Sequence, residues 1–128
     1  FEGSDASFDR MGVLSLNLCG QHVVFSGGER INYLACSDVL KPSDGLCWIT
    51  PGVGELMTRY VGGDLIYGLE KKRPSAWDLY TGERIWQASS TCMANKIHVG
   101  DGWLVFSSFS GNIRCYKWKK SYSSPAKP

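Results

Sequence analysis

A strand-and-turn unit that recurs along the chain limits the possible folds more than any other feature. Three buried apolar runs, at residues 23–26, 65–68 and 103–107, all end on an aromatic residue followed by a small one. Their aromatic residues, Phe25, Tyr67 and Phe106, are 42 and 39 residues apart. A period of about 40 residues, with each copy read as strand, turn, buried strand, turn and strand, predicts an all-β fold of stacked, similar antiparallel units.

The composition agrees with short strands joined by tight turns. Of the 128 residues, 43% are hydrophobic and 12% aromatic, which is enough to build one domain with a substantial core. The 15 glycines fall mostly between short apolar runs, where turns need them. The sequence therefore predicts a nearly helix-free chain.

Residues 75–86 read as a hairpin at the centre of the second unit. Residues 76–79 and 84–86 form its strands, and residues 80–83 form its turn. Gly82 is expected to take the positive φ angle that such turns require. Trp77, Trp86 and Trp103 lie in or end strand-like runs, and all three are predicted to be core residues.

This hairpin resembles the closing hairpin of a β-propeller blade of the WD40 or quinoprotein-like kind. Trp77-Asp78 precedes a Thr-Gly turn, and residues 78–86 follow the quinoprotein-like pattern Asp-x-x-Thr-Gly-x-x-x-Trp. In that family the final tryptophan docks between blades, so the resemblance implies a structural role for Trp86, with Asp78 and Gly82. The family's cofactor-binding residues are not recognisable here, so no cofactor is expected. Only the middle unit carries Trp-Asp, which indicates a divergent propeller.

The resemblance covers residues 12–118, divided into repeats at about 12–45, 46–88 and 89–118. Residues 1–11 are read as a linker or a returning strand. The Lys-, Ser- and Pro-rich residues 119–128 are predicted to be a disordered tail.

Three blades cannot close a ring, because propellers need about four to eight. An open arc would leave an apolar sheet face uncovered at each end. We expect these faces to be covered by further blades of a longer chain, by a second copy or by a partner protein. The start at Phe1, without Met, suggests an excerpted or processed chain.

The net charge limits the possible partners, and the cysteine content indicates the cellular compartment. The net charge of +2 makes nucleic acid an unlikely main partner, and no apolar run approaches the ~18 residues that span a membrane. The five cysteines are odd in number and show no metal-ligand spacing. We expect reduced thiols and a cytoplasmic or nuclear protein.

No spacing proposes catalytic or metal-binding residues, so we expect a non-enzymatic protein-binding scaffold. Candidate contact residues on loops and strand edges are Trp48, Arg59, Lys71, Lys72, Arg73 and Arg84, since Trp and Arg are frequent at binding hot spots. Two alternatives remain open: a fragment of a quinoprotein-like enzyme, and a self-contained small β-domain.

Overall fold

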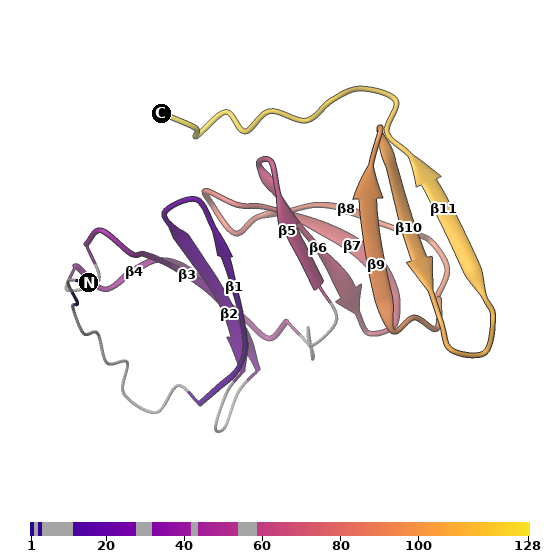
Figure 1. The fold of residues 1–128 in the computed structure, drawn as a ribbon, viewed down its shortest axis with the longest axis horizontal. Helices are drawn as coiled ribbons and strands as arrows, with labels where there is room; N and C mark the ends of the chain where they lie inside the picture. The colour runs from indigo at the N-terminus through magenta and orange to yellow at the C-terminus, as the bar shows by residue number, and fades with distance from the viewer. Residues whose placement is uncertain (2, 4–11, 28–31, 42–43, 54–58) are drawn as a thin grey trace.

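A computed structural model of the chain shows three antiparallel sheets that follow one another along the sequence and fan out side by side (Figure 1). The structure describes residues 1, 3, 12–27, 32–41, 44–53 and 59–128. These residues contain eleven strands and no helix, so the all-β prediction is confirmed. The predicted linker or returning strand at residues 1–11 lies almost wholly outside the described residues.

Each sheet is built from strands that are consecutive in the chain. The first contains β1 (Val13–Cys19), β2 (His22–Gly27), β3 (Tyr33–Asp38) and β4 (Leu46–Pro51). The second contains β5 (Arg59–Gly62), β6 (Leu65–Glu70), β7 (Arg73–Asp78) and β8 (Arg84–Gln87). The third contains β9 (Lys96–Gly100), β10 (Trp103–Ser107) and β11 (Ile113–Lys117). Strand β5 contacts both β1 and β9, so the first strands of the sheets line the inside of the fan.

Equivalent turns confirm that the sheets are copies of one unit. After the third strand of each sheet, a backbone amide donates to a carbonyl in the turn that precedes the second strand. These bonds run from Val39 N to Gln21 O (2.8 Å), from Leu79 N to Asp64 O (2.9 Å) and from Trp118 N to Gly102 O (3.0 Å). The same hydrogen bond thus ends the third strand in all three units.

One predicted boundary between repeats is wrong in detail. Residues 46–51 were assigned to the second repeat, but β4 pairs with β3 and completes the first sheet. The intervening loop returns the chain alongside β3, and a bulge between Cys36 and Ser37 adjusts the register. The charged stretch 70–74 is largely strand, because Lys71 and Lys72 alone form a hairpin turn with φ angles of 50° and 64°.

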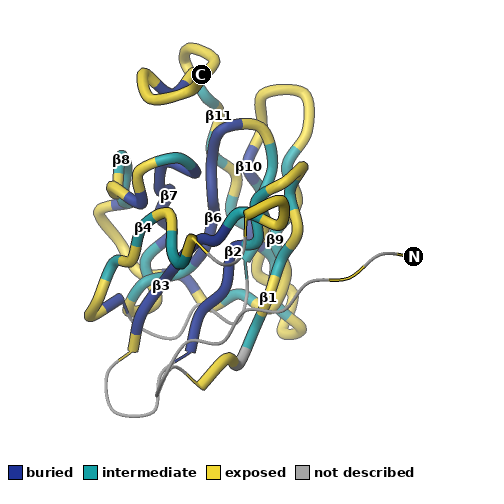
Figure 2. Tube along the Cα trace, turned by 90° about the vertical axis from the view of Figure 1, so that its left-hand side faces the viewer, coloured by how far each residue is buried: buried dark blue, intermediate teal, exposed yellow. Residues whose placement is uncertain are grey.

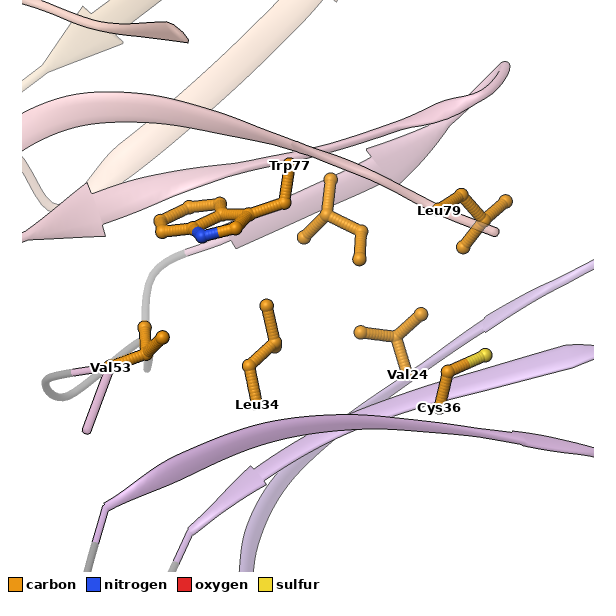
Figure 3. Packing of buried hydrophobic residues seen from close by; sticks show 7 residues of the cluster. Val24, Leu34, Cys36, Val53, Trp77 and Leu79 are labelled. Carbon is orange, nitrogen blue, oxygen red and sulfur yellow. The ribbon is translucent and has the colours of Figure 1, made fainter. Parts of the chain in front are cut away.

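The middle sheet buries both of its faces. On one face, Ile66 and Trp77 pack against Val24 and Leu34 of the first sheet. Figure 3 shows Trp77 facing Val24 and Leu34 between the two sheets. On the other face, a second cluster joins it to the third sheet through Leu65, Tyr67, Ala76, Leu104 and Phe106. In Figure 2 buried stretches run through β2, β3 and β6, whereas β1 and β9 are partly or fully exposed.

The prediction of a buried Trp103 is wrong, whereas Trp77 is buried as predicted. Trp77 is 1% exposed and Trp103 is 42% exposed. Side chains alternate along a strand, so Leu104 and Phe106 point towards the second sheet and Trp103 points to the opposite face. Within the described residues no fourth sheet packs on that face. The ammonium group of Lys117 lies 5.4 Å from the centre of the Trp103 ring.

The C-terminal residues also differ from their prediction as a disordered tail. From β11 the chain runs back over one end of the second sheet towards the first, along the top of Figure 1. Tyr122 donates to Asp78, and the amide of Ser124 donates to Asp64 Oδ2 at 2.8 Å. Lys127 Nζ lies 3.3 Å from Asp64 Oδ1. Buried carboxylates therefore hold a segment whose composition alone indicates disorder.

Candidate functional site

The turn between β7 and β8 is organised by the carboxylate of Asp78. Its Oδ1 accepts hydrogen bonds from the amides of Tyr80 (2.7 Å) and Thr81 (3.0 Å), and Thr81 Oγ1 accepts one from Glu83 N (3.2 Å). Gly82 follows with a φ angle of 76°, as predicted. An aspartate that bonds the next backbone amides is a common way to stabilise a tight turn.

Trp48, predicted to contact a partner, instead joins the first sheet to this turn. Its indole Nε1 donates to Leu79 O at 2.9 Å, and Thr50 Oγ1 donates to Gly82 O at 2.9 Å. A Cβ atom added to Gly82 would lie 2.3 Å from the Trp48 ring. Glycine is therefore needed at position 82 for its φ angle and for this close approach.

Trp86 makes the corresponding joint between the second and third sheets. Its ring lies edge-on to Tyr116, with centroids 4.9 Å apart, and also contacts Trp118 at 6.2 Å. Each four-stranded sheet thus sends a tryptophan from its fourth strand onto the following sheet. This agrees with the position between blades that the sequence resemblance implied for Trp86.

Sequence analysis missed that Trp48 is the first sheet's equivalent of Trp86. Asp38 pairs with His22 as Asp78 pairs with Leu65, and Asp38 Oδ1 accepts a hydrogen bond from Leu40 N at 2.8 Å. The first unit therefore contains the same Asp-to-Trp element with a longer loop. A search that allowed two extra residues between the aspartate and the tryptophan would have found it.

The third sheet departs from this scheme at its final strand. Lys117 pairs with Trp103, at the position that Asp38 and Asp78 occupy in the other units. An ammonium group cannot accept the hydrogen bonds that organise the turn. Within the described residues no fourth strand follows, and β11 forms the sheet's edge.

Arg59, another predicted contact residue, is a second joint between the first and second sheets. Its guanidinium group donates to the side chain of Asn17, to Ser26 Oγ at 2.5 Å and to Val24 O at 3.4 Å. Burial lowers the pKa of Arg59 to about 10, which still leaves it charged at neutral pH. The charged guanidinium group of Arg59 therefore forms hydrogen bonds within the molecule.

The four remaining basic candidates belong to the second sheet and its β6–β7 turn. Arg73 Nε donates to Ala88 O at 2.8 Å. Arg84 forms an ion pair with Glu70 at 3.1 Å, on the exposed surface. Lys71 and Lys72 are exposed on the β6–β7 turn. The six predicted contact residues are therefore not brought together.

The outer face of the third sheet presents apolar side chains. The strand register places Trp103, Val105, Cys115 and Ile113 on this face, together with the polar side chains of Ser107 and Lys117. Ile113 is 70% exposed and Cys115 is also exposed, while Val105 is half-buried. This set, called here the β10–β11 outer face, is the clearest candidate for contact with another protein surface.

The outer face of the first sheet is covered at its centre and exposed at its flanks. The register places Leu16, Phe25, Ala35 and Ile49 in one row across the sheet. Phe25 and Ala35 are buried, whereas Leu16 and Ile49 are exposed. Both ends of the fan therefore carry exposed apolar side chains.

The described part of the chain contains no group of three or more His, Cys, Asp or Glu side chains that could hold a metal ion. In the same residues, no helix has the length and apolar character needed to cross a membrane.

Comparisons with known proteins identify the fold. No protein-family model matches the chain. No curated protein matches it. Among solved structures, BamB from Moraxella catarrhalis superposes with a TM-score of 0.59 at 16% sequence identity. The match covers 83% of this chain and 32% of the BamB chain, so this chain spans about a third of that protein's length.

The chain folds as β-propeller blades. It forms three of them, each an antiparallel sheet, and the third has three strands within the described residues. The computationally designed protein Ika4 also aligns, with 11% identity over 91% of this chain and 99% of Ika4. Its TM-score of 0.48 is too low to support an argument about fold.

Proposed function

We propose that this chain is a protein-binding scaffold, without catalytic activity, built from quinoprotein-like propeller repeats. Its outer sheet faces would be covered by further blades or by a partner protein. The β10–β11 outer face carries the proposal, because it exposes Trp103 and Ile113 where the middle sheet is covered on both faces.

The exposed apolar side chains of this face support a partner. Isolated proteins seldom leave a contiguous apolar patch of more than a few hundred Å² in water. At ~25 cal/mol per Å², covering it is worth on the order of 10 kcal/mol before entropic costs are counted. A second blade-like surface would supply the flat apolar contact that this face requires.

The geometry of the hairpin favours the quinoprotein-like type over the WD40 type. Asp78 binds the amides of its turn, and Trp86 lies between two sheets against Tyr116. These are the first and last residues of the pattern in the sequence. The proposed blade type concerns architecture and does not extend to a cofactor.

An intracellular location is proposed from the cysteines. All five have free thiols, and Cys36 is fully buried. Burial is the main cause that raises the pKa of Cys36 to about 12, so its thiol stays protonated and unreactive. Such a thiol behaves as a small apolar core group.

Sedimentation and apolar-dye binding test the proposed role of the β10–β11 outer face. We expect the purified chain to bind the dye or to self-associate, and Trp103→Glu to reduce both. Leu40→Glu serves as the control, because Leu40 is an exposed apolar residue on a loop away from this face. A monomer of 14.2 kDa that unfolds cooperatively and binds no dye would contradict the proposal and favour a self-contained β-domain.

A further inference from the structure

The end of the second sheet carries two buried carboxylates. Asp64 lies in the β5–β6 turn and is 7% exposed, and Asp78 ends β7 and is 2% exposed. The hydrogen bond from Leu79 N to Asp64 O places both residues at the same end of the sheet. We call this surface the Asp64–Asp78 rim.

Each carboxylate directs an oxygen to the C-terminal segment. Asp78 uses Oδ1 for its own turn, and its Oδ2 accepts the Tyr122 hydroxyl at 2.5 Å. Asp64 Oδ2 accepts the amide of Ser124, while its Oδ1 pairs with Lys127. The rim therefore binds three groups of an extended chain: a tyrosine hydroxyl, a backbone amide two residues later and an ammonium group five residues after the tyrosine.

The segment is held in the manner of a bound peptide. Residues 119–128 form no strand or helix and are mostly exposed, and their described polar contacts with the sheets are made to these two aspartates. Their charge also suits the rim, since the segment contains Lys119, Lys120 and Lys127 and no acidic residue. Contacts of this kind can be reproduced by a separate peptide with the same groups.

A cleft lies beside the rim. A cleft of about 330 Å³ lies between the β1–β2 turn and the residues after β7. Pro128 lines it together with His22 and Tyr80, whose rings stack edge-on at 5.1 Å. Gly63 and Leu79 also line the cleft and directly neighbour Asp64 and Asp78 in the chain, so the cleft adjoins the rim.

We propose that the Asp64–Asp78 rim is a peptide-binding site for a partner protein, and that residues 119–128 occupy it as an internal competitor. The partner segment is extended and basic, with a tyrosine and a lysine five residues after it. This inference concerns a surface separate from the β10–β11 outer face and stands without the function proposed for that face.

A competing internal segment has a measurable consequence. A ligand that binds only the open rim has its apparent affinity lowered by the fraction of molecules in which the rim is open. Because the internal segment is tethered, its effective concentration is on the order of millimolar. Weakening the internal contact should therefore strengthen binding of an external peptide.

The experiment uses the full chain and a fluorescent peptide with the sequence of residues 119–128. Tyr122→Ala in the chain removes the internal tyrosine contact and leaves the rim intact, and Lys127→Ala weakens the contact with Asp64. We expect the peptide to bind the Tyr122→Ala chain at least 10-fold more tightly than the wild-type chain. Ser121→Ala, at an exposed neighbouring position, should bind it as the wild-type chain does.

Two peptide variants identify the contact. Replacing the tyrosine of the peptide by phenylalanine removes the hydroxyl that donates to Asp78, and should weaken binding to the Tyr122→Ala chain at least 10-fold. Phosphorylating the tyrosine should weaken binding by at least as much, because the phosphate would face the carboxylate of Asp78. Adding Asp64→Asn to the Tyr122→Ala chain should weaken it as well. Equal affinity for wild-type and Tyr122→Ala chains with unchanged circular dichroism would overturn the proposal. If Tyr122→Ala does not fold, the same comparison with Lys127→Ala decides the question.

Discussion

The second and third sheets share one strand pattern but differ in their surroundings. In the second sheet, β7 is buried on both sides and Trp77 is 1% exposed. In the third, β10 alternates between buried residues and residues that are half-buried or exposed, and Trp103 is 42% exposed. Alternation decides which side chains share a face, but only a neighbouring sheet decides whether that face is buried.

The two sheets also end differently, and one residue marks the difference. Asp78 accepts the amide hydrogen bonds that begin the turn towards β8. The third sheet has Lys117 at the equivalent position, and the chain after Trp118 runs back to the second sheet. The segment that would continue the third blade instead attaches to the aspartates of its neighbour.

The largest expected effect is the loss of Trp77 from the core. Trp77→Ala should lower the free energy of unfolding by about 3–5 kcal/mol, because it leaves a cavity between the first two sheets. Denaturant titration measures this change, with Trp103→Ala as the matched substitution in the third sheet. Similar losses for the two variants would show that the third sheet's outer face is covered in solution.

Gly82→Ala should have the next largest effect. The added methyl group meets the Trp48 ring, and the φ angle of 76° is unfavourable for alanine. We expect a loss of about 2–3 kcal/mol, of which the backbone angle accounts for about 1–2. Gly20→Ala is the control, because Gly20 has a φ angle of 59° and open space around it. Equal losses for the two variants would argue against the Trp48 contact.

The attachment of the C-terminal segment should depend on pH at both extremes. Burial alone would raise the pKa of Asp78, but hydrogen bonds from Tyr122, Ser124 and two backbone amides lower it below its usual 3.8. This stabilisation is therefore present above about pH 3.8 and is lost as the pH falls through the lowered pKa.

Tyr122 sets the alkaline limit. Burial, followed by its hydrogen bond to Asp78, raises the pKa of Tyr122 to about 12. Its contribution is present below the ordinary value of 10.0 and is lost as the pH rises through about 12. Carbon chemical shifts of residues 122–127 should report both limits. Tyr122→Phe should abolish the alkaline transition, and its persistence in this variant would assign the transition to another group.

The smallest effect on stability is expected at the third sheet's outer face. Trp103→Ala should change the free energy of unfolding by less than about 1 kcal/mol, because the ring is already partly in water. The same substitution should still reduce dye binding or self-association. A loss of stability without any change in association would show that the ring supports the fold of its own sheet.

The features predicted correctly depend on residues close together in sequence. The strands follow from apolar runs separated by glycines, and the β7–β8 turn from Asp78, Thr81 and Gly82 within five residues of one another. The position of Trp86 between blades was implied by the resemblance of residues 78–86 to a nine-residue pattern. Local geometry and short-range hydrogen bonds are sufficient to determine such elements.

The features that were missed depend on contacts between distant residues. Trp48 meets the β7–β8 turn, and Arg59 reaches the first sheet, so two predicted partner contacts are internal joints. Composition alone could not show that Asp64 and Asp78 hold the segment after β11.

The amino-acid sequence by itself therefore determined the repeat, most of its strands and the turn chemistry of the middle blade. Only the tertiary structure decided which tryptophans are buried, which arginine side chains bond within the molecule and where the C-terminal segment lies. The physical reason is that burial and ion pairing depend on what packs against a residue, and a strand's alternation specifies its two faces without specifying their neighbours.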